Sequence, residues 1–224
     1  MGIKLLISAL PNMGKTTLLS SLENVLVIAR DGKKYPFPQP HKNIKDFSID
    51  SLSPADEIIE QVSSAIKAYK QKFNNEIPDT IVFDSISKIL LDIEGITLQR
   101  IKSFPYGVIN TEIKKLMDFI EGLTSRCNII LVSHAVYDEE SFGYKLVNAG
   151  GSWSKKGGVI SEVDYAIFLE MVGSDRKIHF KNPLMLSRTI GLDVPDTMMV
   201  SEFNLQQYVN QLKNLHIEAT NWSL

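Results

Sequence analysis

The sequence predicts an α/β fold whose mainly parallel β-sheet is covered by helices on both faces. Short apolar runs recur along the chain, and amphipathic helical segments separate several of them. These runs are typical of strands buried on both faces, which parallel sheets require. They occupy residues 3–10, 25–28, 80–84, 128–133 and 165–170. The 224 residues, 44% of them hydrophobic, are enough for one core.

Between these strands, the pattern predicts helices over residues 15–23, from Ser53 onward, and over residues 110–124. Ser53 and Pro54 are typical of a helix start, because serine caps the first turn and proline fits its first position. Residues 33–45 contain three prolines and are expected to form an irregular loop. We expect residues 1–224 to form a single domain. Residues 175–224 would be its C-terminal extension, with strands near 178–180 and 184–187 and a helix near 202–212.

Composition excludes several classes of protein. The 24 Lys and Arg residues and 26 Asp and Glu residues leave a net charge of −2, unlike a histone-like protein or an acidic disordered tail. Cys127 is the only cysteine, which excludes an intrachain disulfide and favours a reducing compartment. The apolar run at the start is too short for a signal peptide, and no run approaches the ~18–20 residues of a membrane span. We therefore expect a cytoplasmic protein with no membrane partner.

The strongest motif follows the first apolar run and reads Ala9-Leu10-Pro11-Asn12-Met13-Gly14-Lys15-Thr16-Thr17. It fits the phosphate-binding P-loop pattern, with Ala9 in place of the usual first glycine. Such a loop points backbone N–H groups at phosphates, while its lysine reaches the β- and γ-phosphates and its threonine hydroxyl ligates Mg²⁺. We therefore expect ATP and Mg²⁺ as cofactors. The expected nucleotide-binding residues are Pro11, Asn12, Met13, Gly14, Lys15, Thr16 and Thr17, with Thr16 also a metal ligand.

Three further residues follow predicted strands, where ligands collect in such sheets. Asp84 ends an apolar strand and is the expected second metal-site residue, although a helix-capping role is compatible with this position. Asp31 follows the second strand and is the candidate base that activates water, or else a turn residue beside Gly32. His134 ends the fourth strand and either senses the γ-phosphate or is a capping or solvent-exposed histidine.

The order of these residues resembles the RecA-like P-loop ATPase core, and in particular the small phage-encoded group of AAA-type ATPases that includes single-strand annealing recombinases. The resemblance covers residues 1–190 and is most specific at 7–17, 79–87 and 128–134. It implies a water-activating acid at Asp31, although an aspartate stands where glutamate is more usual. It also implies assembly into rings or filaments, and a role in the host cytoplasm if the chain is phage-encoded.

The resemblance further implies that a basic residue of a neighbouring subunit completes the active site. Arg188 is the expected catalytic arginine acting in trans, with Lys181 as the second candidate. An arginine could neutralise charge on the transferred phosphoryl group. The alternative for Arg188 is an ordinary surface position.

The resemblance also places a DNA-contacting region at residues 137–158. This region contains lysines, glycines and four aromatic residues, Tyr137, Phe142, Tyr144 and Trp153. Aromatic stacking on bases and lysine contacts to phosphates are what single-stranded DNA binding requires. The alternative is a β-hairpin over 142–153 whose aromatic residues pack on the core.

The main hypothesis is an Mg²⁺-dependent ATPase that assembles with itself and acts on single-stranded DNA in recombination or replication. A single-strand binding protein is a further candidate partner. Two alternatives share the P-loop: a small-molecule kinase, and an ATP-binding assembly or switch protein with slow turnover. The five arginines do not cluster along the sequence as the arginine-rich lid of such kinases would require.

Overall fold

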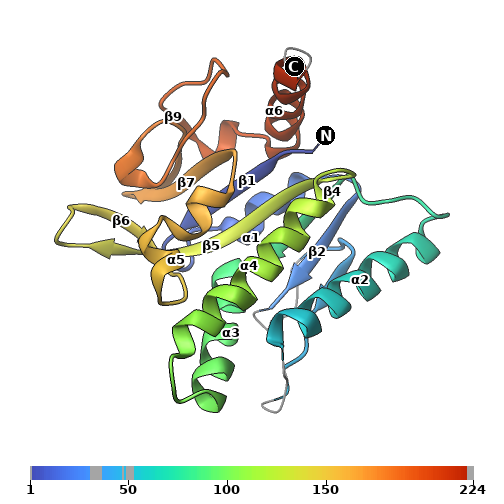
Figure 1. Ribbon diagram of the computed structural model, residues 1–224. Coiled ribbons are helices and arrows are strands. Elements are labelled where there is room, and N and C mark those ends of the chain that lie inside the picture. Colours follow the sequence, from blue (N-terminus) through green and yellow to red (C-terminus); the bar gives the residue numbers. More distant parts are fainter. Residues whose placement is uncertain (1, 31–36, 47, 49–52, 221–224) are drawn as a thin grey trace.

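The computed structural model describes residues 2–30, 37–46, 48 and 53–220. Figure 1 traces the chain, in which strands alternate with helices as an α/β fold requires. The α-helices are α1 (Lys15–Leu18), α2 (Pro54–Lys72), α3 (Ile86–Arg100), α4 (Pro105–Leu123), α5 (Ser152–Lys155) and α6 (Leu205–Thr220). The strands are β1 (Lys4–Ala9), β2 (Val25–Ala29), β3 (His41–Asn43), β4 (Thr80–Asp84), β5 (Asn128–Asp138), β6 (Gly143–Leu146), β7 (Tyr165–Val172), β8 (Asp175–His179) and β9 (Thr197–Met199). The 3-10 turns are η1 (Leu19–Ser21), η2 (Gly158–Glu162), η3 (Pro183–Met185) and η4 (Val200–Glu202).

The described residues form one sheet with the strand order β3-β2-β4-β5-β1-β7-β8-β9, and β6 pairs with the end of β5. The pairs among β1, β2, β3, β4, β5 and β7 are parallel, whereas β6, β8 and β9 join antiparallel. The predicted mainly parallel sheet is therefore confirmed. Because β5 lies between β1 and β4, the carboxyl ends of these three strands share one edge of the sheet.

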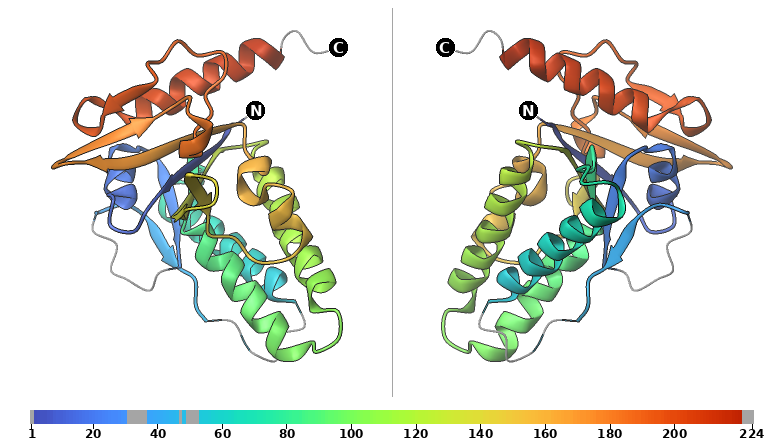
Figure 2. Two further views of the ribbon diagram at one scale, coloured as in Figure 1. Left: turned by 90° about the vertical axis from the view of Figure 1, so that its left-hand side faces the viewer. Right: turned by 90° about the vertical axis from the view of Figure 1, so that its right-hand side faces the viewer.

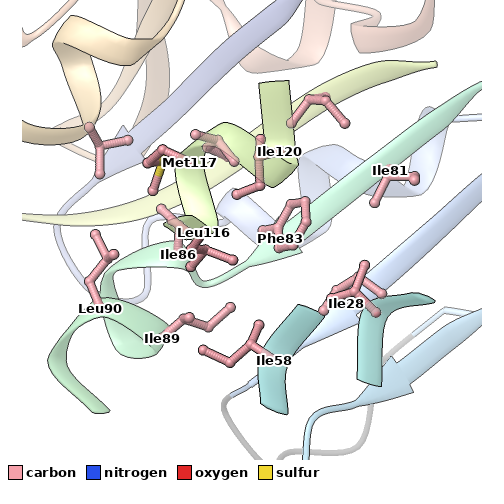
Figure 3. Packing of buried hydrophobic residues seen from close by; sticks show 14 of the residues in the cluster. Ile28, Ile58, Ile81, Phe83, Ile86, Ile89, Leu90, Leu116, Met117 and Ile120 are labelled. Atoms are coloured by element: carbon pink, nitrogen blue, oxygen red, sulfur yellow. The ribbon is translucent and has the colours of Figure 1, made fainter. Parts of the chain in front are cut away.

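Helices cover both faces of this sheet, as predicted. Helices α2, α3 and α4 lie together on one face, and α1 and α6 lie on the other (Figures 1 and 2). Each face of the sheet packs against its helices in a separate hydrophobic core. Figure 3 shows the core beneath α2, α3 and α4, where Phe83 of β4 lies among side chains of these three helices. Burial of such large apolar side chains is the main driving force for folding. Packing in these two cores fixes the positions of β1, β4 and β5, and therefore of their carboxyl ends.

The predicted start of α2 is confirmed in detail. The Ser53 hydroxyl accepts a hydrogen bond from the Asp56 N–H at 3.3 Å, and Pro54 is the first helical residue. The Glu112 carboxylate of α4 accepts further bonds from the Ser53 hydroxyl and the Ala55 N–H, at 2.6 and 3.0 Å. The start of α2 is therefore capped locally and also bonded to the helix beside it.

Several predicted boundaries differ from the structure. The helix expected over 15–23 is only α1, followed by the 3-10 turn η1. The loop expected over 33–45 contains the edge strand β3, and α3 lies where no helix was predicted. The strand expected over 184–187 is wrong, because Asn182 caps the 3-10 turn η3 there and Pro183 begins it. The last helix extends from Leu205 to Thr220, beyond the predicted 202–212.

Candidate nucleotide-binding and catalytic site

The P-loop connects β1 to α1 and lies at the carboxyl edge of the sheet. Gly14 has a φ of 87°, in the left-handed region that a side chain disfavours. A methyl group on its Cα would also lie only 2.7 Å from Nη1 of Arg176. Asn12 has a positive φ as well, at 63°. The loop therefore turns sharply at Asn12 and Gly14, and the absence of a side chain at Gly14 leaves space that the Arg176 guanidinium occupies.

Lys15 is held inside this loop. Its side chain is buried, and Nζ donates hydrogen bonds to the carbonyl oxygens of Ala9 and Leu10 at 3.1 and 3.0 Å. An ammonium group held at the P-loop in this way can neutralise the negative charge of a bound polyphosphate. Of the other predicted binding residues, Pro11, Asn12 and Thr17 are exposed, and Met13 is half-buried.

Thr16 and Asp84 meet across the edge of the sheet. The Thr16 hydroxyl donates a hydrogen bond to Oδ2 of Asp84 at 2.9 Å, although 68 residues separate them in the chain. Asp84 is buried, and it does not provide the α3 cap that the sequence left as an alternative. That cap is Ser85, whose hydroxyl accepts from the Lys88 N–H. The Asp84 carboxylate and the Thr16 hydroxyl are oxygen donors of the kind Mg²⁺ takes beside nucleotide phosphates.

These residues fit the cofactors that the motif implies. Gly14 takes the left-handed conformation that turns the loop, Lys15 supplies a cation, and Thr16 with Asp84 supplies oxygen donors. Bound ATP would supply the β–γ phosphoanhydride bond that is cleaved, and Mg²⁺ would offset the negative charge on the phosphates. The described residues contain no group of three or more His, Cys, Asp and Glu side chains arranged as a metal site. The expected site needs no such group, because water and phosphates complete the shell of Mg²⁺.

His134 lies beside the start of the P-loop. In the β1–β5 register its Cα is the partner of Ala9, the residue at which β1 ends. Its backbone N–H donates to the Ser87 hydroxyl at 3.2 Å, which joins β5 to the first turn of α3. The structure thus brings His134 to the same edge as Lys15, Thr16 and Asp84, and its role as a γ-phosphate sensor stays a prediction.

Asp31, the predicted water-activating base, lies outside the described residues. The residue before it is fixed firmly: Arg30 Nε lies 2.6 Å from Asp92 of α3, and its Nη2 lies 2.9 Å from Asp46. Burial alone would lower the pKa of Arg30, but the hydrogen bonds to Asp46 and Asp92 outweigh burial and hold the pKa above its ordinary value. The backbone N–H of Arg30 also donates a hydrogen bond to the backbone carbonyl oxygen of Asp84 at 2.8 Å. The chain therefore enters the segment of Asp31 from a point next to Asp84.

Arg188, the predicted arginine in trans, lies apart from the P-loop of its own chain. It pairs with Ala166 of β7, which aligns with Leu6 in the middle of β1. Its Nη2 donates to the carbonyl oxygens of Val163 and, at 3.4 Å, of Ile160. Arg188 thus supports the turn before β7, and Lys181 is exposed. A contact of either residue with a neighbouring subunit stays a prediction.

The region over 137–158 contains an antiparallel hairpin of β5 and β6 followed by α5. The hairpin pairs residues 135–138 with 143–146, so the alternative hairpin over 142–153 is not the one formed. Tyr137 is 52% exposed and Phe142 is 80% exposed. Tyr144 instead packs on Phe168, with ring centroids 4.6 Å apart, and the half-buried Trp153 packs against the core. Two of the four aromatic residues are therefore available to a ligand.

A cavity of about 700 Å³ lies elsewhere, between β2, β3 and the C-terminal half of α2. Its lining includes Val25, Pro40, Tyr69 and Phe73, and no P-loop residue. Val25 begins β2, so this cavity is at the opposite end of the strand from Asp84 and the P-loop. It is not the predicted nucleotide site.

One cation beside the P-loop was not among the predicted site residues. Arg176 comes from β8, far along the chain from Gly14, yet its guanidinium contacts the loop. The contact depends on pairing between β1, β7 and β8, so no local pattern around Arg176 indicates it.

Comparison with known proteins identifies the family of this chain. Residues 1–197 match the protein family described as an AAA domain. A search of curated protein sequences finds no match. Among solved structures, an ATPase from the type III secretion system of pathogenic bacteria is similar, with 17% identity and a TM-score of 0.48 over 76% of this chain and 51% of that one. The chain thus spans about half the length of that ATPase.

Within the part of the chain that the structure describes, every helix is too short or too polar to cross a bilayer. The fold, the P-loop between β1 and α1, and the family match over residues 1–197 lead to one conclusion. The chain belongs to the AAA domain family and is a P-loop ATPase.

Proposed function

We propose that this ATPase binds single-stranded DNA through its β5–β6 hairpin and uses ATP to control that binding during recombination or replication. One observation carries the proposal. Strand β5 runs directly from His134, beside the P-loop, to Tyr137 and the exposed tip of the hairpin. A change at the phosphates could therefore reach the hairpin along a single strand.

The exposed side chains of this hairpin suit a nucleic acid. Tyr137 and Phe142 offer aromatic faces on which bases can stack. Lys155 and Lys156, at the end of α5, are exposed as well. Lys145 is already paired with Asp138 at 3.1 Å. The net charge of −2 provides no broad attraction for DNA, so we expect stacking to contribute more than charge.

The resemblance to phage-encoded RecA-like proteins supports two further parts of this proposal. The active protein would be a homo-oligomer, a ring or a filament, with Arg188 completing the neighbouring subunit's site. Its location would be the cytoplasm, that of the host if the chain is phage-encoded. A single-strand binding protein is the proposed additional partner, because it occupies the same DNA.

The test is binding of fluorescent oligo(dT), measured by anisotropy with and without a slowly hydrolysed ATP analogue. Replacing Tyr137 and Phe142 by Ala should weaken binding at least tenfold, because one stacked base contributes about 1–3 kcal/mol. The matched control is Phe104→Ala, which removes an aromatic residue that is 90% exposed at the start of α4, outside the hairpin. Equal affinity of the wild type and the hairpin variant would contradict the proposal.

ATPase assays with and without DNA separate the alternatives. DNA-stimulated turnover supports the proposed function. Transfer of phosphate to a small molecule would indicate a kinase instead. Tight ATP binding with slow, DNA-independent turnover would indicate an assembly or switch protein.

A further inference from the structure

The β7–β8 hairpin extends past the end of β1 and lies along the P-loop. Strand β1 ends at Ala9, whose partner in β7 is Leu169. Strand β7 continues to Val172, and β8 returns from Asp175, with Arg176 paired to Met171. The tip of this hairpin therefore lies beyond the point where the P-loop begins.

Arg176 projects on the same face of the sheet as the P-loop helix. Side chains alternate between faces along a strand, so Arg176 shares its face with Ile178, two residues later. Ile178 is fully buried in the core that contains Leu18 and Leu19, from α1 and η1. Lys177, between them, points to the opposite face. Strand geometry thus directs Arg176 toward the P-loop and Lys177 away from it.

The guanidinium of Arg176 reaches the loop itself. A methyl group on Gly14 would lie 2.7 Å from its Nη1 and 3.3 Å from its Cζ. The guanidinium therefore lies against the Gly14 Cα, next to Lys15 in the chain. The Arg176 residue as a whole is exposed, so a ligand can reach its side chain from solvent.

We propose that Arg176 binds the phosphates of the nucleotide held by the P-loop of its own chain. A guanidinium is planar and donates paired hydrogen bonds to phosphate oxygens, and it stays charged at any pH the protein experiences. Two cations from Lys15 and Arg176 at one loop favour a polyanion over any neutral ligand. This inference rests on nucleotide binding at the P-loop, and it adds a contact within one subunit to the one proposed for Arg188 between subunits.

The test is the affinity for a fluorescent ATP analogue of wild type and three variants. Arg176→Ala should weaken binding about tenfold, as expected for an exposed charged hydrogen bond. Arg176→Lys, which keeps the charge but not the paired geometry, should be intermediate. Lys177→Ala removes a cation from the same strand on the opposite face and should bind like the wild type. Thermal melting of each variant checks the fold, which the exposed Arg176 is not expected to stabilise.

Two outcomes separate this inference from the nucleotide binding at the P-loop on which it rests. If the wild type binds ATP, Lys15→Ala does not, and Arg176→Ala binds like the wild type, the role of Arg176 is wrong while the P-loop assignment stands. If Lys15→Ala binds ATP as well as the wild type, nucleotide binding at the P-loop is wrong, and the role of Arg176 falls with it.

A mixing experiment tests that the contact lies within one chain. Lys15→Ala protein supplies an intact Arg176 but no functional P-loop. Adding it to Arg176→Ala protein should leave the weakened ATP affinity unchanged. Restored affinity would assign the contact to a neighbouring subunit and overturn the inference.

Discussion

Asp84→Asn separates the proposed metal role of Asp84 from its structural role. The buried Asp84 carboxylate accepts a 2.9 Å hydrogen bond from the Thr16 hydroxyl. An asparagine has almost the same shape, and its amide oxygen can accept the same bond. The substitution therefore removes a negative charge at the expected Mg²⁺ site while it preserves the packing of β4.

The size of the effect follows from the position of Asp84. Besides offering an oxygen to the metal, Asp84 accepts a hydrogen bond from the predicted metal ligand Thr16 and would orient that ligand. Loss of such partners typically weakens metal affinity or activity 10–100-fold. This range corresponds to about 1.4–2.7 kcal/mol. The melting temperature should change little, because the hydrogen bond is retained.

The assay is a titration of MgCl₂ into protein with a fluorescent ATP analogue, compared with binding in excess EDTA. For Asp84→Asn, we expect the Mg²⁺-dependent gain in affinity to fall 10–100-fold and the affinity in EDTA to stay unchanged. The control is Asp79→Asn, which removes an exposed carboxylate just before the other end of β4. A variant with wild-type Mg²⁺ dependence would refute the metal role of Asp84.

Four further predictions follow from the same site and its surroundings. Lys15→Ala should lower ATP turnover about a hundredfold or more without unfolding the chain, since it loses at least one charged hydrogen bond to phosphate; wild-type turnover would contradict the P-loop assignment. Asp31→Asn should leave ATP binding nearly intact but slow hydrolysis ~10²–10⁴-fold, and equal loss of affinity in Asp31→Asn and Asp84→Asn would refute their division of roles. Arg188→Ala and Lys15→Ala proteins, each inactive alone, should recover ATPase activity when mixed, and no recovery in verified mixed oligomers would count against the role in trans. Melting curves of Arg188→Ala check whether loss of its hydrogen bond to the Val163 carbonyl destabilises the fold. Cys127 should resist alkylation at pH 8 until the chain is unfolded, because burial raises the pKa of its thiol to about 11, and rapid labelling of folded protein would show otherwise.

The sequence alone determined those parts of the fold that depend on neighbouring residues. Short, mainly apolar runs predicted the buried strands, and β4 has the predicted bounds. The cap and proline at Ser53 and Pro54 predicted the start of α2, because capping involves only residues within one turn. The P-loop was identified for the same reason, since its binding groups lie in nine consecutive residues.

Elements without such local signals were missed or misplaced. Helix α3 contains Gly95, which weakens the helical pattern, and Ile89, Leu90 and Ile93 stabilise it by packing in the core. Strand β3 is three residues long and forms only because β2 offers an edge to pair with. Their conformations depend on neighbours that are distant in the chain.

Tertiary structure alone decided which polar and charged groups meet at the P-loop. Thr16 and Asp84 were each chosen from sequence, but their contact depends on the positions of β1 and β4 on either side of β5. Arg176 was not chosen at all, because only the pairing of β1 with β7 and of β7 with β8 brings it to Gly14. Local sequence determines strands, caps and the P-loop, since these need only adjacent residues. The grouping of their side chains into one site is set by strand order, which burial of the whole sheet decides.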